Sequence, residues 1–454
     1  MSLAESPVHS SSSDGFADLL ERELESGSSE SSPDEEDKAA AADDGSDVEI
    51  ESRIKRQKVE TVEILEEANA STSGGLLEEN SDLSAMEDLC AHPGSFGDMC
   101  FLCGQRLVEQ SGVTFGYIHK GLRLHNDEID RLRNTDIKKS LNNKKLYLVL
   151  DLDHTLLNST QQNHMTAEEE YLMSPPDSLP DALKDSLFRL DFMRMMTKLR
   201  PFIRTFLKEA SEIFEMYVYT MGDRAYALEM AKLLDPKKEY FGDRVISRDD
   251  GTQKHQKGLD IVLGQESAVL ILDDTENAWI KHKDNLILME RYHFFRSSCA
   301  QFGYTCESLS ELKSDESEPD GALANVLDLL KRIHKIFFYD LGGNLIDRDV
   351  RQVLRTVRKE VLKGCKVVFS RIIPSKFQAD SHHLWKMAEQ LGAICCTEVD
   401  SSVTHVVALD AGTEKSRWAV KQKKYLVHPR WLEAANYMWR KQPEEKFPVT
   451  EAKM

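Results

Sequence analysis

A short apolar run that ends in acids constrains the fold of this chain more than any other feature. Residues 145–153 read Lys-Leu-Tyr-Leu-Val-Leu-Asp-Leu-Asp, so five apolar residues lead directly into Asp151 and Asp153. A continuous apolar run of this length is typical of a central parallel strand that is covered on both faces. Open parallel sheets place their ligand sites at the carboxyl ends of the strands. The run therefore predicts an α/β sheet with two carboxylates at its functional edge.

The surrounding sequence extends this prediction to a whole sheet. Further strands are expected at residues 216–220, 244–247, 268–273 and 285–288. Amphipathic helical patterns separate them, for example at residues 200–210 and 224–234. Strands that alternate with helices predict a doubly wound parallel sheet.

Polar residues follow two other strands of the predicted sheet, as the acids follow the first. Asp273 and Asp274 end one run, and Thr220 ends another. Asp273 and Asp274, together with the two acids of the first run, form an oxygen-rich set that suits Mg²⁺. Thr220 and Lys257 suit a phosphate group. An isolated Asp-x-Asp is more simply explained by acids that cap a turn, so the combination carries the prediction of a phosphate site.

In their order and strand context, these groups resemble the four motifs of the haloacid dehalogenase superfamily. Three strings narrow the resemblance: Asp-Leu-Asp-His-Thr-Leu at 151–156, Lys-Leu-Arg-Pro-Phe at 198–202 and Tyr-Thr-Met-Gly-Asp-Arg-Ala-Tyr-Ala at 219–227. They are similar to the RNA polymerase II C-terminal-domain phosphatases of the type that interacts with transcription factor IIF, above all the plant C-terminal-domain phosphatase-like members. The resemblance covers about residues 88–450. It implies a haloacid-dehalogenase-like sheet, a small α/β BRCT domain and a disordered acidic N-terminal tail.

The resemblance also implies roles for single residues. Asp151 would attack phosphorus and form an aspartyl-phosphate. Asp153 would protonate the leaving serine oxygen and then activate water, and its backbone carbonyl would contact Mg²⁺. Asp151, Asp153 and Asp274 would hold the metal, with Asp273 in support.

Thr220 and Lys257 would then hold the phosphate. Arg200 and Arg224 stand beside the motifs, where they would either steer the substrate or form ordinary surface ion pairs. Both interpretations remain open on the sequence alone.

The spacing of the motifs bears on the size of the substrate. Only about 41 residues separate Asn158 from Leu199, and about 23 separate Asp250 from Asp273. Neither gap is expected to hold a sizeable cap, so the predicted site is open. An open site favours a large, flexible substrate such as a phosphopeptide tail over a small molecule.

A cysteine-rich segment precedes the first predicted strand of the sheet. Cys90-Ala-His92 is followed by Cys100-Phe-Leu-Cys103-Gly. A Cys-x-x-Cys turn before glycine resembles half of a zinc knuckle, which Cys90 and His92 would complete to a four-ligand Zn²⁺ site. A pair of reduced thiols and a redox pair are the alternatives.

Three strings near the C-terminus resemble a BRCT domain: Gly392-Ala393, Thr404-His-Val-Val and Pro429-Arg-Trp-Leu. Ser370 and Lys415 stand where a phosphate pocket would need a hydroxyl and a lysine, whereas an arginine follows Ser370 in place of the usual glycine. A phosphopeptide ligand and plain protein docking both remain open.

The N-terminal tail accounts for most of the negative charge. Residues 1–82 hold 23 acidic and 6 basic residues, while the whole chain carries a net charge of −20. Low hydrophobicity and high charge predict disorder. A basic island in the tail can serve as a nuclear-localisation signal; it consists of Arg53, Lys55, Arg56 and Lys58.

The predicted organisation is a disordered tail at 1–87, a cysteine-containing extension at 88–143, a catalytic domain at 144–308, a linker with helices at 309–362 and a BRCT domain at 363–450. No apolar run approaches the roughly 18 residues of a membrane span. No early segment resembles a secretory signal, which favours an intracellular protein.

The predicted function is that of a nuclear, Mg²⁺-dependent protein-serine phosphatase. By the resemblance, its partners are the phosphorylated C-terminal domain of RNA polymerase II and general transcription factor IIF. No direct nucleic-acid contact is expected, because the core shows no strong basic stripe. The alternatives are a phosphatase of another nuclear phosphoprotein and a non-catalytic phosphopeptide-binding scaffold.

Overall fold

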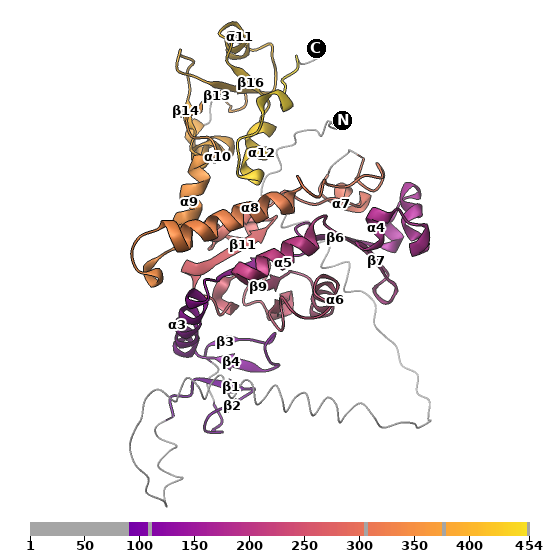
Figure 1. The fold of residues 1–454 in the computed structure, drawn as a ribbon, viewed down its shortest axis with the longest axis vertical. Coiled ribbons are helices and arrows are strands. Elements are labelled where there is room, and N and C mark those ends of the chain that lie inside the picture. Colours follow the sequence, from indigo (N-terminus) through magenta and orange to yellow (C-terminus); the bar gives the residue numbers. More distant parts are fainter. Residues whose placement is uncertain (1–89, 108–110, 304–306, 375–377, 452–454) are drawn as a thin grey trace, which may run out of the picture. The chain divides into compact units, whose positions relative to one another are not determined.

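A computed structural model describes residues 90–107, 111–303, 307–374 and 378–451 (Figure 1). The predicted disordered tail and its basic island lie outside these residues. Among the helices within these ranges, none combines the length and apolar character needed to cross a bilayer.

A five-stranded, entirely parallel sheet forms the centre of the catalytic region, with the strand order β10-β9-β5-β11-β12. The strands are β5 (Leu146–Leu150), β9 (Phe214–Tyr219), β10 (Val245–Ile246), β11 (Val269–Asp273) and β12 (Leu286–Leu288). Every residue of β5 is buried, as its unbroken apolar run predicts. The predicted parallel α/β sheet is therefore confirmed.

Helices between the strands place apolar residues against this sheet. They include α5 (Ile203–Ile213) and α6 (Arg224–Leu234), and α8 (Ala322–Lys335) packs against α5. Asp223 caps α6, because its side chain accepts from the backbone N–H of Tyr226 at 2.8 Å. This cap fixes the first turn of α6 directly after the end of β9.

A second parallel sheet forms the C-terminal unit, with the order β14-β13-β15-β16. Its strands are β13 (Lys366–Ser370), β14 (Ile394–Cys396), β15 (His405–Ala408) and β16 (Tyr425–Val427), and its helices are α10 (His383–Gln390), α11 (Glu414–Lys421) and α12 (Arg430–Met438). Trp431 of α12 is fully buried and stacks on His405, with 4.6 Å between the ring centres. The predicted small α/β BRCT unit is present, and α9 (Val350–Glu360) precedes it.

The insert after β5 contains a folded element that its length did not reveal. Strands β6 (Leu157–Gln161), β7 (Leu187–Leu190) and β8 (Met195–Leu199) form an antiparallel sheet in the order β6-β8-β7. Leu187 and Met196 belong to a small apolar cluster that also includes Tyr292, Phe294 and Phe295 from outside the insert. The gap therefore holds a compact sheet, although not a large cap domain.

The first part of the predicted linker, residues 309–321, contacts the core of the catalytic region. Asp315 pairs with Lys198 at 2.6 Å, and Glu316 pairs with Arg200 at 2.7 Å. Both cations are almost fully buried. These partners lie more than a hundred residues apart in the chain, so composition could not reveal the contact.

The cysteine-containing extension forms another small sheet, in the order β2-β1-β4-β3. Its strands are β1 (Gly94–Phe96), β2 (Met99–Cys100), β3 (Val113–Thr114) and β4 (Leu122–Leu124), and α3 (Asn126–Asn142) leads from it to β5.

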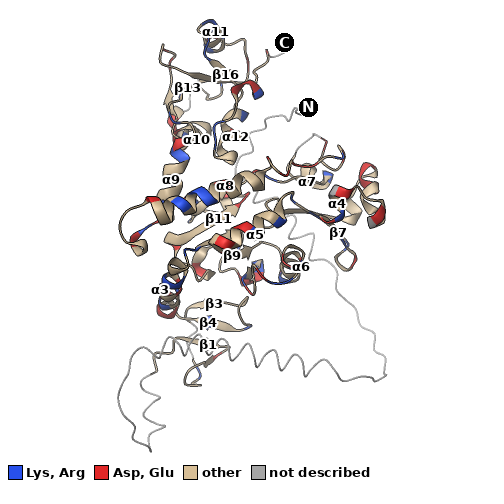
Figure 2. Ribbon diagram, in the orientation of Figure 1, with Lys and Arg blue, Asp and Glu red and all other residues tan. Residues whose placement is uncertain are grey.

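Lys and Arg residues gather along α8 and α9 (Figure 2). Several of them face acids: Lys331 pairs with Glu209 at 2.5 Å, and Arg332 and Arg355 pair with Glu360 and Asp284. Much of the positive charge on these helices is therefore matched within the chain.

Candidate active site

The predicted acids and the hydroxyl meet at one edge of the central sheet. Strand β5 lies between β9 and β11, and Leu150 stands level with Val218 on one side and Leu272 on the other. The backbone N–H of Asp151 donates to the carbonyl of Leu272 at 2.9 Å. Because all three strands run in the same direction, Asp151, Thr220 and Asp273 end at the same edge.

Lys257 joins two of these carboxylates. Its Nζ donates to Oδ1 of Asp151 at 2.5 Å and to Oδ2 of Asp273 at 2.6 Å, and all three side chains are buried. Burial alone would lower the pKa of Lys257, but the two carboxylates outweigh burial and raise it above its ordinary value. The lysine therefore carries its charge throughout the physiological pH range.

Burial acts on the carboxylates in the opposite direction. Reinforced by the charge of Asp273, it raises the pKa of Asp151 well above its ordinary value, and Lys257 opposes this rise. Burial likewise raises the pKa of Asp273. Two buried acids beside one lysine leave negative charge that a further cation would stabilise.

The donor set fits a divalent metal ion. Carboxylate oxygens of Asp151, Asp273 and Asp274 lie within 4.8 Å of one another. These are the hard oxygen ligands that Mg²⁺ prefers. Asp274 also pairs with Arg291 at 2.5 Å, so Arg291 holds this carboxylate in a fixed orientation.

The side chain of Asp153 does not belong to this oxygen cluster. Its Oδ1 accepts from the phenol of Tyr226 at 2.5 Å, and its Oδ2 accepts from the hydroxyl of Thr220 at 3.3 Å. The carboxylate is thereby held apart from the metal ligands, as a separate acid or base would need to be.

Sequence reasoning missed Tyr226. It lies in the first turn of α6, inside the string Ala-Tyr-Ala, where an aromatic residue reads as core. The phenol is buried, and burial together with Asp153 raises its pKa well above the ordinary value. The available signal was its place in the string at 219–227, six residues after Thr220.

Arg200 and Arg224 are both engaged by protein groups. Arg200 is fully buried; it donates to both oxygens of Glu316 and to the carbonyl of Thr155. Arg224 donates to the carbonyl of Val245 and lies 3.4 Å from a carboxylate oxygen of Asp250. The pair formed by Arg200 is thus a buried one.

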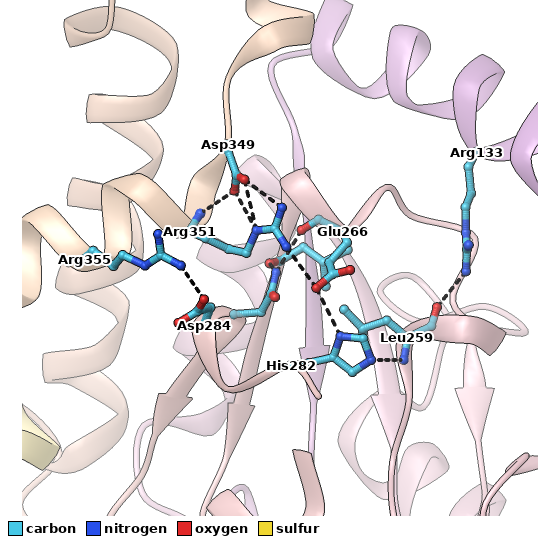
Figure 3. Close-up of polar contacts among 10 residues, drawn as sticks. Arg133, Leu259, Glu266, His282, Asp284, Asp349, Arg351 and Arg355 are labelled. Carbon is cyan, nitrogen blue, oxygen red and sulfur yellow. Dashed lines mark hydrogen bonds and ion pairs between the residues drawn. The ribbon is translucent and has the colours of Figure 1, made fainter. Parts of the chain in front are cut away.

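The backbone of the segment that carries Lys257 is held by hydrogen bonds to two other parts of the chain. The N–H of Lys257 donates to the carbonyl of Ala278 at 2.9 Å. Arg133 of α3 donates to the carbonyls of Leu259, Asp260 and Val262, at 2.7 to 3.0 Å through one nitrogen (Figure 3).

A second set of contacts reaches the same segment from α9. The backbone N–H of Leu259 donates to Nε2 of His282 at 3.3 Å, and Nδ1 of His282 lies 3.2 Å from Glu266. Glu266 in turn accepts from Arg351 at 3.1 Å, and Asp349 holds the same guanidinium (Figure 3). The helix that leads to the BRCT unit is therefore connected to the lysine segment.

The four predicted zinc ligands also come together. The ligand atoms of Cys90, His92, Cys100 and Cys103 all lie within 4.8 Å of one another.

In the BRCT unit, the candidate phosphate-pocket residues contact protein groups. The hydroxyl of Ser370 lies 2.7 Å from that of Thr413, and Lys415 donates to the carbonyl of Thr397. Arg371 adopts a φ of 54°, the left-handed conformation that glycine adopts without strain.

Comparison with known proteins identifies the family. Residues 146–319 match the family described as NLI interacting factor-like phosphatase, and residues 371–431 match the twin BRCT domain. RNA polymerase II C-terminal domain phosphatase-like 4 of Arabidopsis thaliana is 61% identical over 100% of this chain and 98% of its own length. The chain belongs to the RNA polymerase II C-terminal domain phosphatase family. It is a protein phosphatase.

Other members of this family are more distant. Phosphatase-like 3 of Arabidopsis thaliana is 43% identical over 68% of this chain, which corresponds to 26% of that longer protein. The solved structure of Fcp1, an essential RNA polymerase II CTD phosphatase, covers 70% of this phosphatase and 100% of its own chain, with 26% identity and a TM-score of 0.56. A fission yeast Fcp1 variant bound to beryllium fluoride gives 27% identity, the same coverage and a TM-score of 0.57.

Proposed function

We propose that this phosphatase removes phosphate from serine side chains in the C-terminal repeat domain of RNA polymerase II, through an aspartyl-phosphate and with Mg²⁺. The contact of Lys257 with Asp151 and Asp273 is the observation that carries the chemistry. The substrate is proposed from the names of the relatives, of which phosphatase-like 4 of Arabidopsis thaliana matches the whole length of this chain. Nuclear localisation and the contact with transcription factor IIF are parts of the same proposal.

The first half-reaction uses both acids of the first strand end. An oxygen of Asp151 forms a bond to phosphorus while the bond from phosphorus to the serine oxygen breaks. Asp153, protonated, gives its proton to that leaving oxygen, so serine departs as a neutral alcohol. Tyr226 and Thr220 orient Asp153 for this transfer through its two oxygens.

The second half-reaction restores the enzyme. Asp153, now ionised, takes a proton from a water molecule whose oxygen attacks phosphorus. The bond between phosphorus and Asp151 breaks, inorganic phosphate leaves, and both acids return to their starting states. Lys257 stays charged throughout and balances negative charge beside Asp151.

The bound metal would supply further positive charge to the phosphate oxygens. Asp151, Asp273 and Asp274 are the side chains placed to hold it. The raised pKa values of Asp151 and Asp273 support a cation at this place, because a cation would stabilise their ionised forms.

The deciding experiment measures turnover on two substrates. Purified full-length protein is given a serine-phosphorylated CTD repeat peptide and, separately, a small aryl phosphate. The wild type is expected to hydrolyse both, whereas Asp151→Asn is expected to lose nearly all activity on both, because the amide is a poor nucleophile. Asp328→Asn, which changes an exposed acid of α8, is the matched control and should keep full activity.

The alternatives give different results. Hydrolysis of the aryl phosphate without hydrolysis of any CTD peptide would indicate another phosphoprotein substrate. Peptide binding without hydrolysis of either substrate would indicate a non-catalytic scaffold. Substantial activity in Asp151→Asn would rule out the aspartyl-phosphate.

A further inference from the structure

The cysteine-rich extension presents four metal-ligand atoms in a tight cluster that none of the phosphate-site residues shares. Sγ of Cys90 lies 3.9 Å from Sγ of Cys100, and Sγ of Cys103 lies 3.4 Å from Nδ1 of His92. All four atoms lie within 4.8 Å of one another. We propose that they hold one structural Zn²⁺ ion, and that this ion supports the backbone segment that follows Lys257.

The distances match those of a tetrahedral zinc site. With Zn–S bonds of about 2.3 Å and Zn–N bonds of about 2.0 Å, tetrahedral angles place two sulfurs about 3.8 Å apart and a sulfur and a nitrogen about 3.5 Å apart. The two measured separations lie close to these values. A disulfide would need its sulfurs about 2.0 Å apart, so the thiols of Cys90 and Cys100 are not bonded to each other.

The chain builds this cluster with a short hairpin. Strands β1 and β2 pair antiparallel, with Ser95 opposite Cys100, and Gly97 turns the chain with a φ of 62°. This pairing returns Cys100 to the segment that carries Cys90 and His92. After β2, the N–H of Gly104 donates to the carbonyl of Cys100 at 2.9 Å, which closes the turn that presents Cys103.

The extension is expected to depend on a bound metal ion because its own apolar core is small. Its four strands are only two or three residues long. Sheets of this size are not stable independently unless they pack on something else or bind a metal. A structural zinc ion would supply part of the folding free energy directly.

The extension contacts the catalytic region at a specific place. The phenol of Tyr117, in the connection between β3 and β4, donates to the carbonyl of Ile261 at 2.9 Å, and Tyr117 and Phe115 are both buried. Strand β3 also contacts the short helix Leu259–Ile261. This helix begins two residues after Lys257, so an extension kept folded by zinc would hold the lysine segment in place.

The test measures metal content and local exchange in the full-length protein. Untagged protein, dialysed into metal-free buffer, is expected to contain about one Zn²⁺ per chain. Cys103→Ser is expected to lose that zinc and to show faster amide hydrogen exchange in residues 94–124 and 259–262. Cys396→Ser, which changes a half-buried cysteine of β14, is the matched control and should keep both zinc and exchange rates.

A second variant separates the metal from the contact. Tyr117→Phe should keep zinc but exchange faster at residues 259–262, because only the hydrogen bond to Ile261 is lost. Slower dissociation of zinc than of Mg²⁺ under mild chelation is also expected. If Cys103→Ser does not fold, an organomercurial titration of the wild type replaces it, and about one zinc ion should be released as the cluster thiols react.

Three results would overturn the proposal. They are wild-type protein without zinc, zinc that is retained in Cys103→Ser, and a mercurial titration that releases none. Unchanged exchange at residues 259–262 in both variants would overturn the supporting role. Metal content does not depend on the substrate, so these outcomes are independent of the proposed phosphatase reaction.

Discussion

The phenol of Tyr226 donates a hydrogen bond of 2.5 Å to Oδ1 of Asp153. The bond joins the first turn of α6 to the end of β5 and holds the proposed acid/base away from the metal ligands. The hydroxyl of Ser159 lies 3.0 Å from the same phenol oxygen, so Tyr226 is itself held in position. We regard Tyr226 as a positioning residue.

Tyr226→Phe is therefore expected to lower kcat roughly ten- to hundredfold, which corresponds to the loss of one hydrogen bond to Asp153 in the ionised form that it takes in the second half-reaction. KM should change little, because the phenol does not contact substrate in this proposal. Steady-state kinetics on the aryl phosphate checks both values. Tyr339→Phe, at an exposed position, is the control, and an unchanged kcat in Tyr226→Phe would remove the positioning role.

Lys257→Met is expected to abolish turnover and to make stability depend more steeply on pH. Without the lysine, Asp151 and Asp273 face each other uncompensated, so their folded-state pKa values rise further above the unfolded values. An acid with a raised folded pKa binds more protons in the folded state, and stability falls as pH rises through that pKa.

The deficit in melting temperature of Lys257→Met relative to the wild type should therefore be larger at pH 8 than at pH 5. Thermal unfolding in metal-free buffer measures it at each pH. A deficit that shrinks toward pH 8 would mean that the two carboxylates do not carry raised pKa values in the folded variant.

Removal of Mg²⁺ with a chelator is expected to stop turnover, and added Mg²⁺ should restore it. Asp274→Asn should need a higher Mg²⁺ concentration for half-maximal activity, because one anionic ligand is lost. Beryllium fluoride with Mg²⁺ should inhibit the wild type by imitating a phosphorylated Asp151, and it should not bind Asp151→Asn. A titration of activity against Mg²⁺ and calorimetry with the inhibitor test these points.

Arg351→Ala should weaken catalysis without touching the phosphate site. Arg351 acts through Glu266 and His282 on the segment after Lys257, so its effect should not add to that of His282→Ala. A double-mutant cycle on kcat/KM is expected to give a coupling of about 0.5–3 kcal/mol. The same cycle with Arg189→Ala, which breaks an exposed pair with Asp191, should be additive within error.

The central sheet was predictable because its strands are buried on both faces. Such strands read as unbroken apolar runs, and β5 ends where its run meets Asp151. The helix at 224–234 was predicted with the bounds that α6 has, since Asp223 is a strong N-cap and the apolar spacing is regular. The parallel order of β9, β5 and β11 then brought the strand-end groups to one edge.

Other features depended on contacts between distant residues. The pairing of Arg200 with Glu316, the anchoring of Leu259 by Arg133 and the pairing of Arg351 with Glu266 join residues that lie 85 to 126 positions apart. The short strands of the insert and of the cysteine-rich extension carry too few residues for a clear periodic pattern.

The sequence by itself determined the order of the elements, the groups at the strand ends and the family, because hydrophobic periodicity and local motifs are properties of neighbouring residues. Tertiary structure decided which groups actually touch. It put Asp153 with Tyr226 and Thr220 instead of among the metal-ligand carboxylates, and it gathered Cys90 and His92 around the Cys-x-x-Cys turn. Side-chain hydrogen bonds and ligand clusters require atoms within a few ångströms, and only the folded chain sets those distances.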